Sequence, residues 1–108
     1  MNGDGEQTRD FTFIENAIQA NIKAMFSQKA EAVNQVYNIA VGDRASVKEA
    51  FEILNAIENK AIKAIHREAR PGDVRDSLAD ISKAKELLGY NPTVRFKEGL
   101  LTTYNWMK

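Results

Sequence analysis

Apolar residues recur at intervals of three and four along most of this sequence, and this spacing constrains the fold more than any other feature. In an α-helix, that interval places side chains on one face, so each such stretch predicts an amphipathic helix. The pattern predicts helices over residues 14–26, 47–57, 81–88 and 96–107. Gly99 weakens the last of them, because glycine costs a helix interior about 1 kcal/mol relative to alanine.

The strand-like segments are few, short and widely separated. Residues 35–41, 62–65 and 74–78 are predicted as strands, and residues 10–14 as a short strand or an extended lead-in to the first helix. Three such strands make a poor independent sheet, whereas four amphipathic helices each need a surface to pack against. We therefore expect an α+β chain that is mostly helical and that lacks one of its packing layers.

Two of the predicted helices carry signals at their ends. Ser46 and Glu49 have the spacing of a capping box, in which each side chain accepts a hydrogen bond from the backbone N–H of the other residue. Asp80 is suited to cap the third helix, and Gly89 to supply the left-handed residue that ends it. Pro92 prevents this helix from continuing.

The composition excludes several classes of function. The 108 residues hold 15 basic and 15 acidic side chains, so the chain lacks the basic surface that binding to nucleic acid requires. Cysteine is absent and histidine occurs once, which excludes a disulfide framework and a thiolate or multi-histidine metal site. No apolar run approaches the roughly 20 residues of a membrane span. The start of the chain has no leader pattern, so we expect a soluble cytoplasmic domain.

Three motifs resemble functional sites but are better explained without one. The loop containing Gly3 and Gly5 lacks the third glycine and the preceding strand of a dinucleotide-binding fingerprint. Tyr104 and Lys108 have the spacing of a dehydrogenase proton shuttle, but the tyrosine belongs to an apolar face and the lysine ends the chain, so we predict a packing role. His66 has no second ligand or nucleophile near it in sequence, so we predict a surface or hydrogen-bonded histidine.

Three charged residues are stronger candidates for a binding site. Arg9 follows a glycine-containing loop, and Arg70 precedes a turn that contains Asp73. A guanidinium donates two parallel hydrogen bonds to phosphate oxygens, and a carboxylate accepts hydrogen bonds from sugar hydroxyls. From the spacing alone, the three residues are better explained as solvated surface charges.

Three sequence blocks resemble one family. Residues 70–90 read RPGDVRDSLADISKAKELLGY, residues 3–14 read GDGEQTRDFTFI, and residues 36–40 read VYNIA. In this order they closely resemble the carboxy-terminal part of extended short-chain dehydrogenase/reductase enzymes, especially UDP-glucose and UDP-N-acetylglucosamine 4-epimerases. The resemblance covers nearly the whole chain.

The resemblance implies that residues 1–108 are the substrate-binding lobe of an NAD-dependent nucleotide-sugar epimerase, a fragment that packs against a Rossmann-type domain. In that family, the arginines that match Arg9 and Arg70 bind the diphosphate of the UDP-sugar, and the aspartate that matches Asp73 binds the ribose hydroxyls. No firm role is carried over to Arg75. The family's NAD-binding glycines and its catalytic tyrosine and lysine precede the equivalent of residue 3, so this chain by itself is expected to hold no NAD and no catalytic residue.

Several alternatives stay open. The same scaffold serves dehydratases, decarboxylases and reductases of nucleotide sugars, so the type of reaction is less constrained than the class of substrate. A non-enzymatic helical interaction module is a further alternative. We also predict self-association or local disorder at the strand expected over 36–40, because its edge and the neighbouring apolar faces lack a partner.

Overall fold

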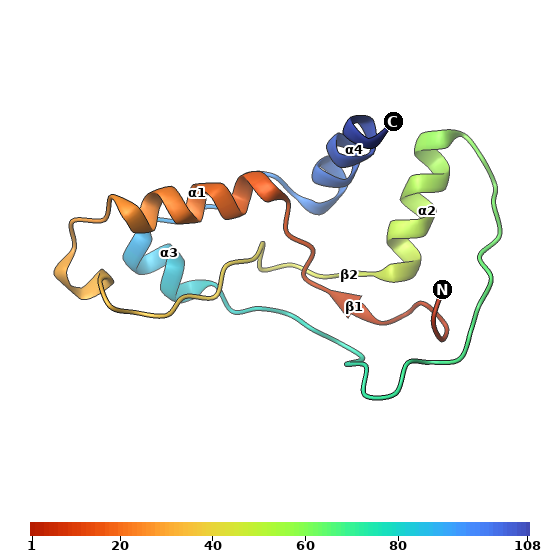
Figure 1. Ribbon diagram of the computed structural model, residues 1–108, viewed down its shortest axis with the longest axis horizontal. Helices are drawn as coiled ribbons and strands as arrows, with labels where there is room; N and C mark the ends of the chain where they lie inside the picture. The colour runs from red at the N-terminus through yellow and green to blue at the C-terminus, as the bar shows by residue number, and fades with distance from the viewer.

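The computed structural model describes all 108 residues as four helices, one short 3₁₀ turn and a two-stranded sheet (Figure 1). In chain order the elements are β1 (Thr8–Arg9), α1 (Ile14–Met25), η1 (Ala30–Ala32), β2 (Ala45–Ser46), α2 (Val47–Glu58), α3 (Ser82–Leu88) and α4 (Phe96–Met107). Helices α1 and α3 pack together at one end of the molecule, and α2 and α4 at the other end (Figure 1). None of the helices is both long enough and apolar enough to span a lipid bilayer.

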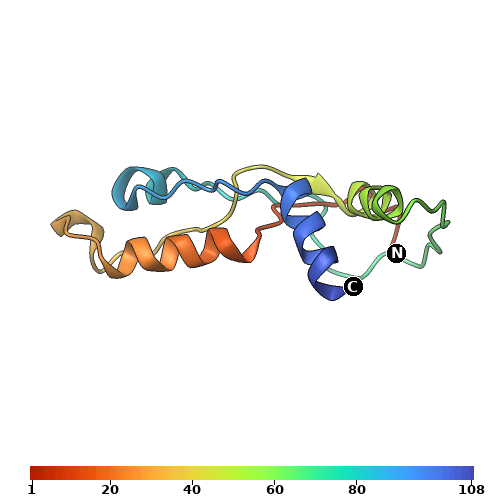
Figure 2. The same cartoon turned by 90° about the horizontal axis from the view of Figure 1, so that it is seen from above.

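The molecule is a thin layer, as the view from above makes clear (Figure 2). Its extents are 52 × 32 × 17 Å, and its radius of gyration is 16.6 Å. A compact domain of this length would have a radius of about 13 Å. Only 13 of the 108 residues are buried. The chain therefore does not enclose a full hydrophobic core, in agreement with the expectation that one packing layer is lacking.

The small core that does exist lies between α1 and α3. Its buried members are Ala20, Ala40, Ile81, Ala84 and Tyr90. The hydroxyl of Tyr90 donates to the carbonyl oxygen of Ala40 at 2.6 Å, so the one large side chain of this core has no unpaired polar atom. Burial, with the Asp10 carboxylate nearby, raises the pKa of Tyr90.

The helix-end predictions are confirmed for Ser46, Glu49 and Gly89, whereas the one for Asp80 was wrong, because Ile81 is the N-cap residue of α3 and makes no side-chain cap. Ser46 accepts from the backbone of Glu49 at 3.0 Å, and Glu49 accepts from the backbone of Ser46 at 3.3 Å, which completes the capping box of α2. Gly89 ends α3 in the left-handed conformation, with φ of 68°. Asp80 accepts from the backbone N–H of Ser82, the first residue of α3, at 2.9 Å.

Gly99 inside α4 has a packing reason. A Cβ atom at this position would lie 2.8 Å from the Cβ of Phe13 and 3.0 Å from its Cγ. Only glycine lets the helix approach this closely. Glycine therefore destabilises the helix itself but allows α4 to pack against Phe13, in the lead-in to α1.

The predicted strands over 35–41, 62–65 and 74–78 were wrong for this chain, since none of the three segments forms a strand. The sheet consists instead of β1 and β2, paired antiparallel with Thr8 opposite Ser46 and Arg9 opposite Ala45. Strand-forming residues need a neighbouring strand to satisfy their backbone groups, and the chain offers none beside residues 35–41. The carbonyl oxygen of Val36 is instead met by the ammonium of Lys83, at 3.0 Å.

Candidate functional site

The candidate site is a strip in which the first nine residues lie alongside residues 65–77. The latter belong to the long connection between α2 and α3, which contains no helix or strand (Figure 1). Backbone hydrogen bonds join the two segments in four places: Arg67 N to Met1 O at 2.8 Å, Gly3 N to Arg67 O at 2.8 Å, Thr8 N to Arg75 O at 2.8 Å, and Ser77 N to Thr8 O at 3.2 Å. The strip thus brings together residues that are more than sixty positions apart in sequence.

Arg9 and Asp73 form an ion pair across this strip. Nη2 of Arg9 lies 2.7 Å from Oδ1 of Asp73, and Nη1 of Arg9 donates to the carbonyl oxygen of Thr8 at 2.6 Å. The two side chains are 30% and 33% exposed. The guanidinium is thereby held in one orientation while part of it still faces solvent, as recognition of an anion requires.

Arg70 begins the turn that carries Asp73. The backbone N–H of Asp73 donates to the carbonyl oxygen of Arg70 at 3.2 Å, and Gly72 between them has a φ of 78°. The Arg70 side chain is exposed and makes no hydrogen bond or ion pair. Of the three predicted site residues, the structure therefore joins Arg9 to Asp73 directly, whereas Arg70 is linked to Asp73 only through the backbone of the turn.

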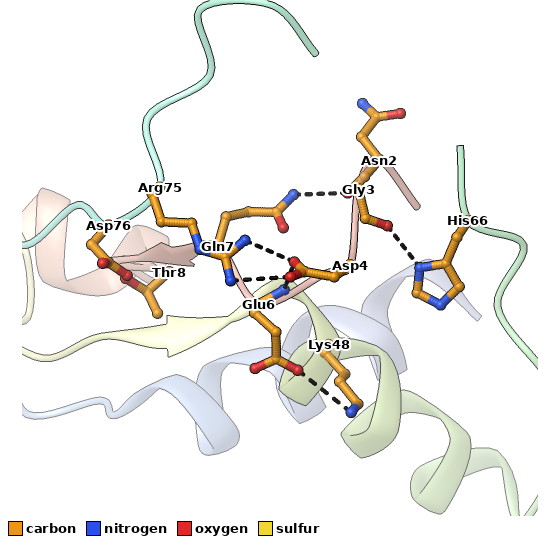
Figure 3. A network of polar contacts seen from close by, with 10 residues as sticks. All are labelled: Asn2, Gly3, Asp4, Glu6, Gln7, Thr8, Lys48, His66, Arg75 and Asp76. Atoms are coloured by element: carbon orange, nitrogen blue, oxygen red, sulfur yellow. Dashed lines mark hydrogen bonds and ion pairs between the residues drawn. The ribbon is translucent and has the colours of Figure 1, made fainter. Parts of the chain in front are cut away.

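A further set of polar contacts lies along the same strip (Figure 3). The guanidinium of Arg75 donates to both carboxylate oxygens of Asp4, at 2.8 and 3.1 Å. The hydroxyl of Thr8 donates to Asp76 at 2.8 Å. The Arg75 guanidinium lowers the pKa of Asp4 to about 2, and Asp4 in turn raises the pKa of Arg75.

None of the four residues in these contacts, Asp4, Thr8, Arg75 and Asp76, was predicted to have a role. Asp4 and Arg75 are 71 positions apart, so no local spacing marks them as partners. His66 was predicted to be a surface or hydrogen-bonded residue, and that prediction is confirmed, because its Nδ1 lies 2.8 Å from the carbonyl oxygen of Gly3.

The glycine-containing loop at the start of the chain does not fit a dinucleotide phosphate. Phosphate cradles of this kind need a glycine-rich turn that leads directly into a helix N-terminus. Here the next helix begins only at Ile14, and the Asp4 carboxylate between the two glycines accepts from the backbone N–H of Glu6 at 2.9 Å. This loop therefore does not build a dinucleotide-phosphate site.

Two grooves on the surface lie away from the Arg9–Asp73 pair. A groove of about 720 Å³ runs between α1 and the end of α3, with Ile18, Ile22, Phe26, Leu87 and Leu88 among its lining residues. Another, of about 460 Å³, lies between α2 and α4. Neither groove is lined by Arg9, Arg70 or Asp73.

Comparison with known proteins decides the family. The model of the family described as GDP-mannose 4,6 dehydratase matches residues 1–103. The chain belongs to this family. The match corresponds to the carboxy-terminal part of extended short-chain dehydrogenase/reductase proteins, the family that the three sequence blocks predicted.

Family relatives match along almost the whole chain. GDP-mannose 3,5-epimerase of Arabidopsis thaliana is 38% identical over 108 residues, which are 100% of this chain and 27% of that protein. UDP-glucuronate 4-epimerase of Thermodesulfobacterium geofontis is 36% identical, over 98% of this chain and 32% of its own length. The chain therefore spans about a third or less of the length of these relatives.

A solved relative confirms the fold. The crystal structure of UDP-glucuronic acid 4-epimerase from Bacillus cereus, in complex with UDP-glucuronic acid and NAD, superposes with a TM-score of 0.92 at 36% identity. The superposition covers 99% of this chain and 34% of that one. The predicted fold class, a mostly helical α+β lobe matching a fragment of a Rossmann-type NAD-dependent epimerase, is confirmed.

Proposed function

We propose that this chain is the nucleotide-sugar-binding part of an NAD-dependent epimerase, and that it cannot catalyse the reaction alone. Arg9 and Arg70 bind the diphosphate of a UDP-sugar, and Asp73 accepts hydrogen bonds from the ribose hydroxyls. The observation that carries the proposal is the 2.7 Å contact between Arg9 and Asp73, residues 64 positions apart that meet beside the turn begun by Arg70.

The electrostatics of the pair suit this role. The Arg9 guanidinium has five N–H donors and uses one on Asp73 and one on a backbone oxygen, which leaves donors for phosphate. The second oxygen of the Asp73 carboxylate makes no hydrogen bond to another side chain, and the Asp73 side chain is a third exposed. A guanidinium that is oriented before the ligand arrives loses less conformational freedom on binding.

The rest of the binding pocket comes from a Rossmann-type domain that packs against this lobe. Large apolar side chains on α1 are exposed in this chain: Ile14, Ile18, Ile22, Met25 and Phe26. Exposed apolar surface of this kind marks a contact face. We place the partner domain on α1 and on the neighbouring segment 36–40, where Val36 is 85% exposed.

The reaction proposed for the whole protein is 4-epimerisation of a UDP-hexose with NAD as hydride carrier. Dehydration of a nucleotide sugar is the second candidate, and the description of the matching family model favours it. The test is to assay the full-length protein that contains this segment with NAD against UDP-glucose and UDP-N-acetylglucosamine. Production of the 4-epimer supports the proposal, whereas loss of water from the sugar would replace epimerase by dehydratase.

Binding by this chain itself is tested by nuclear magnetic resonance. Titration with UDP should give saturable shifts at the amide of Asp73 and the Nε–H of Arg9, with weak affinity because the second domain does not contribute. Arg9→Gln should weaken binding by about tenfold, the usual effect of one charge-assisted hydrogen bond. Arg67→Gln is the matched control, because it removes a guanidinium from the same connection but outside the turn.

The outcome also separates the proposal from a non-enzymatic interaction module. A module that only binds another protein through the apolar face of α1 predicts no saturable shift at Arg9 or Asp73 at any UDP concentration. Equal weakening by Arg9→Gln and Arg67→Gln would indicate nonspecific attraction of the phosphates and would likewise reject the proposed site.

A further inference from the structure

The turn that carries Arg70 and Asp73 has little to hold it in place. It lies within residues 59–81, a connection without helix or strand, and nothing lies within 4 Å of the position where a Cβ would extend from Gly72. The Asp73 to Arg70 backbone hydrogen bond is internal to the turn. The position of the turn relative to Arg9 therefore depends on the Arg9–Asp73 ion pair and on contacts made by the residues on either side of the turn.

Just after the turn, two side-chain links join the connection to the start of the chain, beside the backbone hydrogen bonds made by Thr8. Arg75 meets Asp4 through two parallel hydrogen bonds, and Asp76 accepts from the hydroxyl of Thr8 (Figure 3). The Arg75–Asp4 contact is the only two-bond ion pair in the chain. A fork of this kind fixes both the distance and the angle between two groups, which a single bond does not.

We propose that Asp4 and Arg75 form a positioning pair, which sets the turn of residues 70–73 against Arg9 and thereby raises the affinity of the site for a nucleoside diphosphate. Neither residue touches the ligand. Arg75 acts through the backbone that leads to Asp73, two residues earlier, and Asp4 acts through the loop that leads to Arg9. This inference rests on the proposed function of Arg9 and Asp73.

The charge state of the pair fits this role. Because Arg75 lowers the pKa of Asp4 to about 2, the carboxylate is ionised at every pH at which the chain would meet a nucleotide. Asp4 also accepts a hydrogen bond from the backbone N–H of Glu6. This bond within the loop orients the Asp4 carboxylate independently of Arg75. The pair is thus not switched by pH in the range in which the chain would meet a nucleotide.

The test uses the 108-residue chain, with UDP as the probe and amide resonances as the readout. Arg75→Gln and Asp4→Asn each remove the fork, and Arg75→Lys keeps the charge but cannot donate two parallel bonds. Lys48→Gln is the matched control, because Lys48 pairs with Glu6 of the same loop at 3.4 Å, with similar exposure, but does not touch the connection. All variants are titrated beside the wild type, and amide exchange is measured without ligand.

The expected result has three parts. Arg75→Gln and Asp4→Asn each weaken UDP binding by about two- to five-fold, in the range found for exposed ion pairs, and Arg75→Lys restores part of the loss. The double variant is no weaker than either single one, because both remove the same contact. The amides of Thr8 and Ser77, which join the two segments, exchange faster in these variants but not in Lys48→Gln.

Each other outcome rejects the inference. If the amides exchange faster but UDP affinity is unchanged, the pair is structural only. If the losses add in the double variant, the two residues act separately. Failure of the wild type to bind UDP overturns the proposed function and this inference together, whereas wild-type binding that Arg75→Gln leaves unchanged overturns this inference alone.

Discussion

Two side chains on α1 make the same pair of hydrogen bonds to the segment before α4, but one is more deeply buried than the other. Removing the two side chains should therefore lower the free energy of unfolding by different amounts. Asn16 donates to the carbonyl oxygen of Val94 at 2.7 Å and accepts from its N–H at 3.2 Å. One helical turn away, Gln19 makes the same two bonds with Asn91, at 2.7 and 2.8 Å. Asn16 is 1% exposed, whereas Gln19 is half-buried and its two hydrogen bonds are open to solvent.

The magnitude follows from what replaces the lost bonds. An exposed hydrogen bond contributes about 0.5 kcal/mol net, at the low end of the usual range, whereas breaking a bond so that a buried polar group keeps no partner costs about 1–3 kcal/mol. Asn16→Ala removes two bonds where water has little access, so we expect the free energy of unfolding to fall by about 2–3 kcal/mol. Gln19→Ala removes two bonds that water replaces, and we expect a loss of about 0.5–1 kcal/mol.

Urea denaturation followed by circular dichroism measures this difference, at protein concentrations low enough to avoid association. A loss of 2–3 kcal/mol corresponds to a fall of roughly 10–20 °C in melting temperature for a chain of this size. If Asn16→Ala leaves too little folded protein for a transition, hydrogen exchange at the Val94 amide in Asn16→Ser provides the comparison. Equal losses for Asn16→Ala and Gln19→Ala would refute the reasoning from burial.

Three further predictions concern packing, charge and association. Gly99→Ala should lower the free energy of unfolding by about 1–3 kcal/mol, because the new methyl group meets Phe13 at 2.8 Å; urea denaturation measures it, and an unchanged midpoint would contradict the packing reason. The pKa of Asp4 should be about 2 against its ordinary 3.8 in a carboxyl-carbon titration, and Arg75→Gln should return it toward 3.8. Because this pKa is depressed by folding, the pair's contribution to stability is present above about pH 4 and is lost as the pH falls toward 2. The chain should self-associate in sedimentation velocity through the apolar face of α1, and Ile22→Glu should shift it toward monomer; a wild-type monomer with protected amides over residues 36–40 would argue against this.

The helices were predictable because their signals are local. The capping box at Ser46, the left-handed Gly89 and the apolar spacing of α1 each depend on residues within one or two turns, and each was found where the sequence predicted it. The strands were not, because β-branched residues such as those over 35–41 form a strand only beside another strand. Here the hydrogen-bonding partner of that segment does not lie within the chain.

The candidate site was predictable only in part. Spacing alone did not distinguish Arg9 and Asp73 from solvated charges, and the family resemblance singled them out. Their direct contact arises from the pairing of two distant segments, which no local pattern encodes. The same is true of Asp4 and Arg75, whose partnership follows from the course of a connection that has no regular structure.

The molecule is only 17 Å thick, and this affects where amino-acid substitutions are tolerated among homologous chains. A helix with its side chains is about 10–12 Å across, so a layer this thin has two broad faces and little interior, and nearly every side chain belongs to one face or the other. Substitutions accumulate freely where only solvent lies against a face and slowly where another molecule does. The pattern of amino-acid exchange among homologous chains would therefore map, residue by residue, which side of this layer is covered in the living cell.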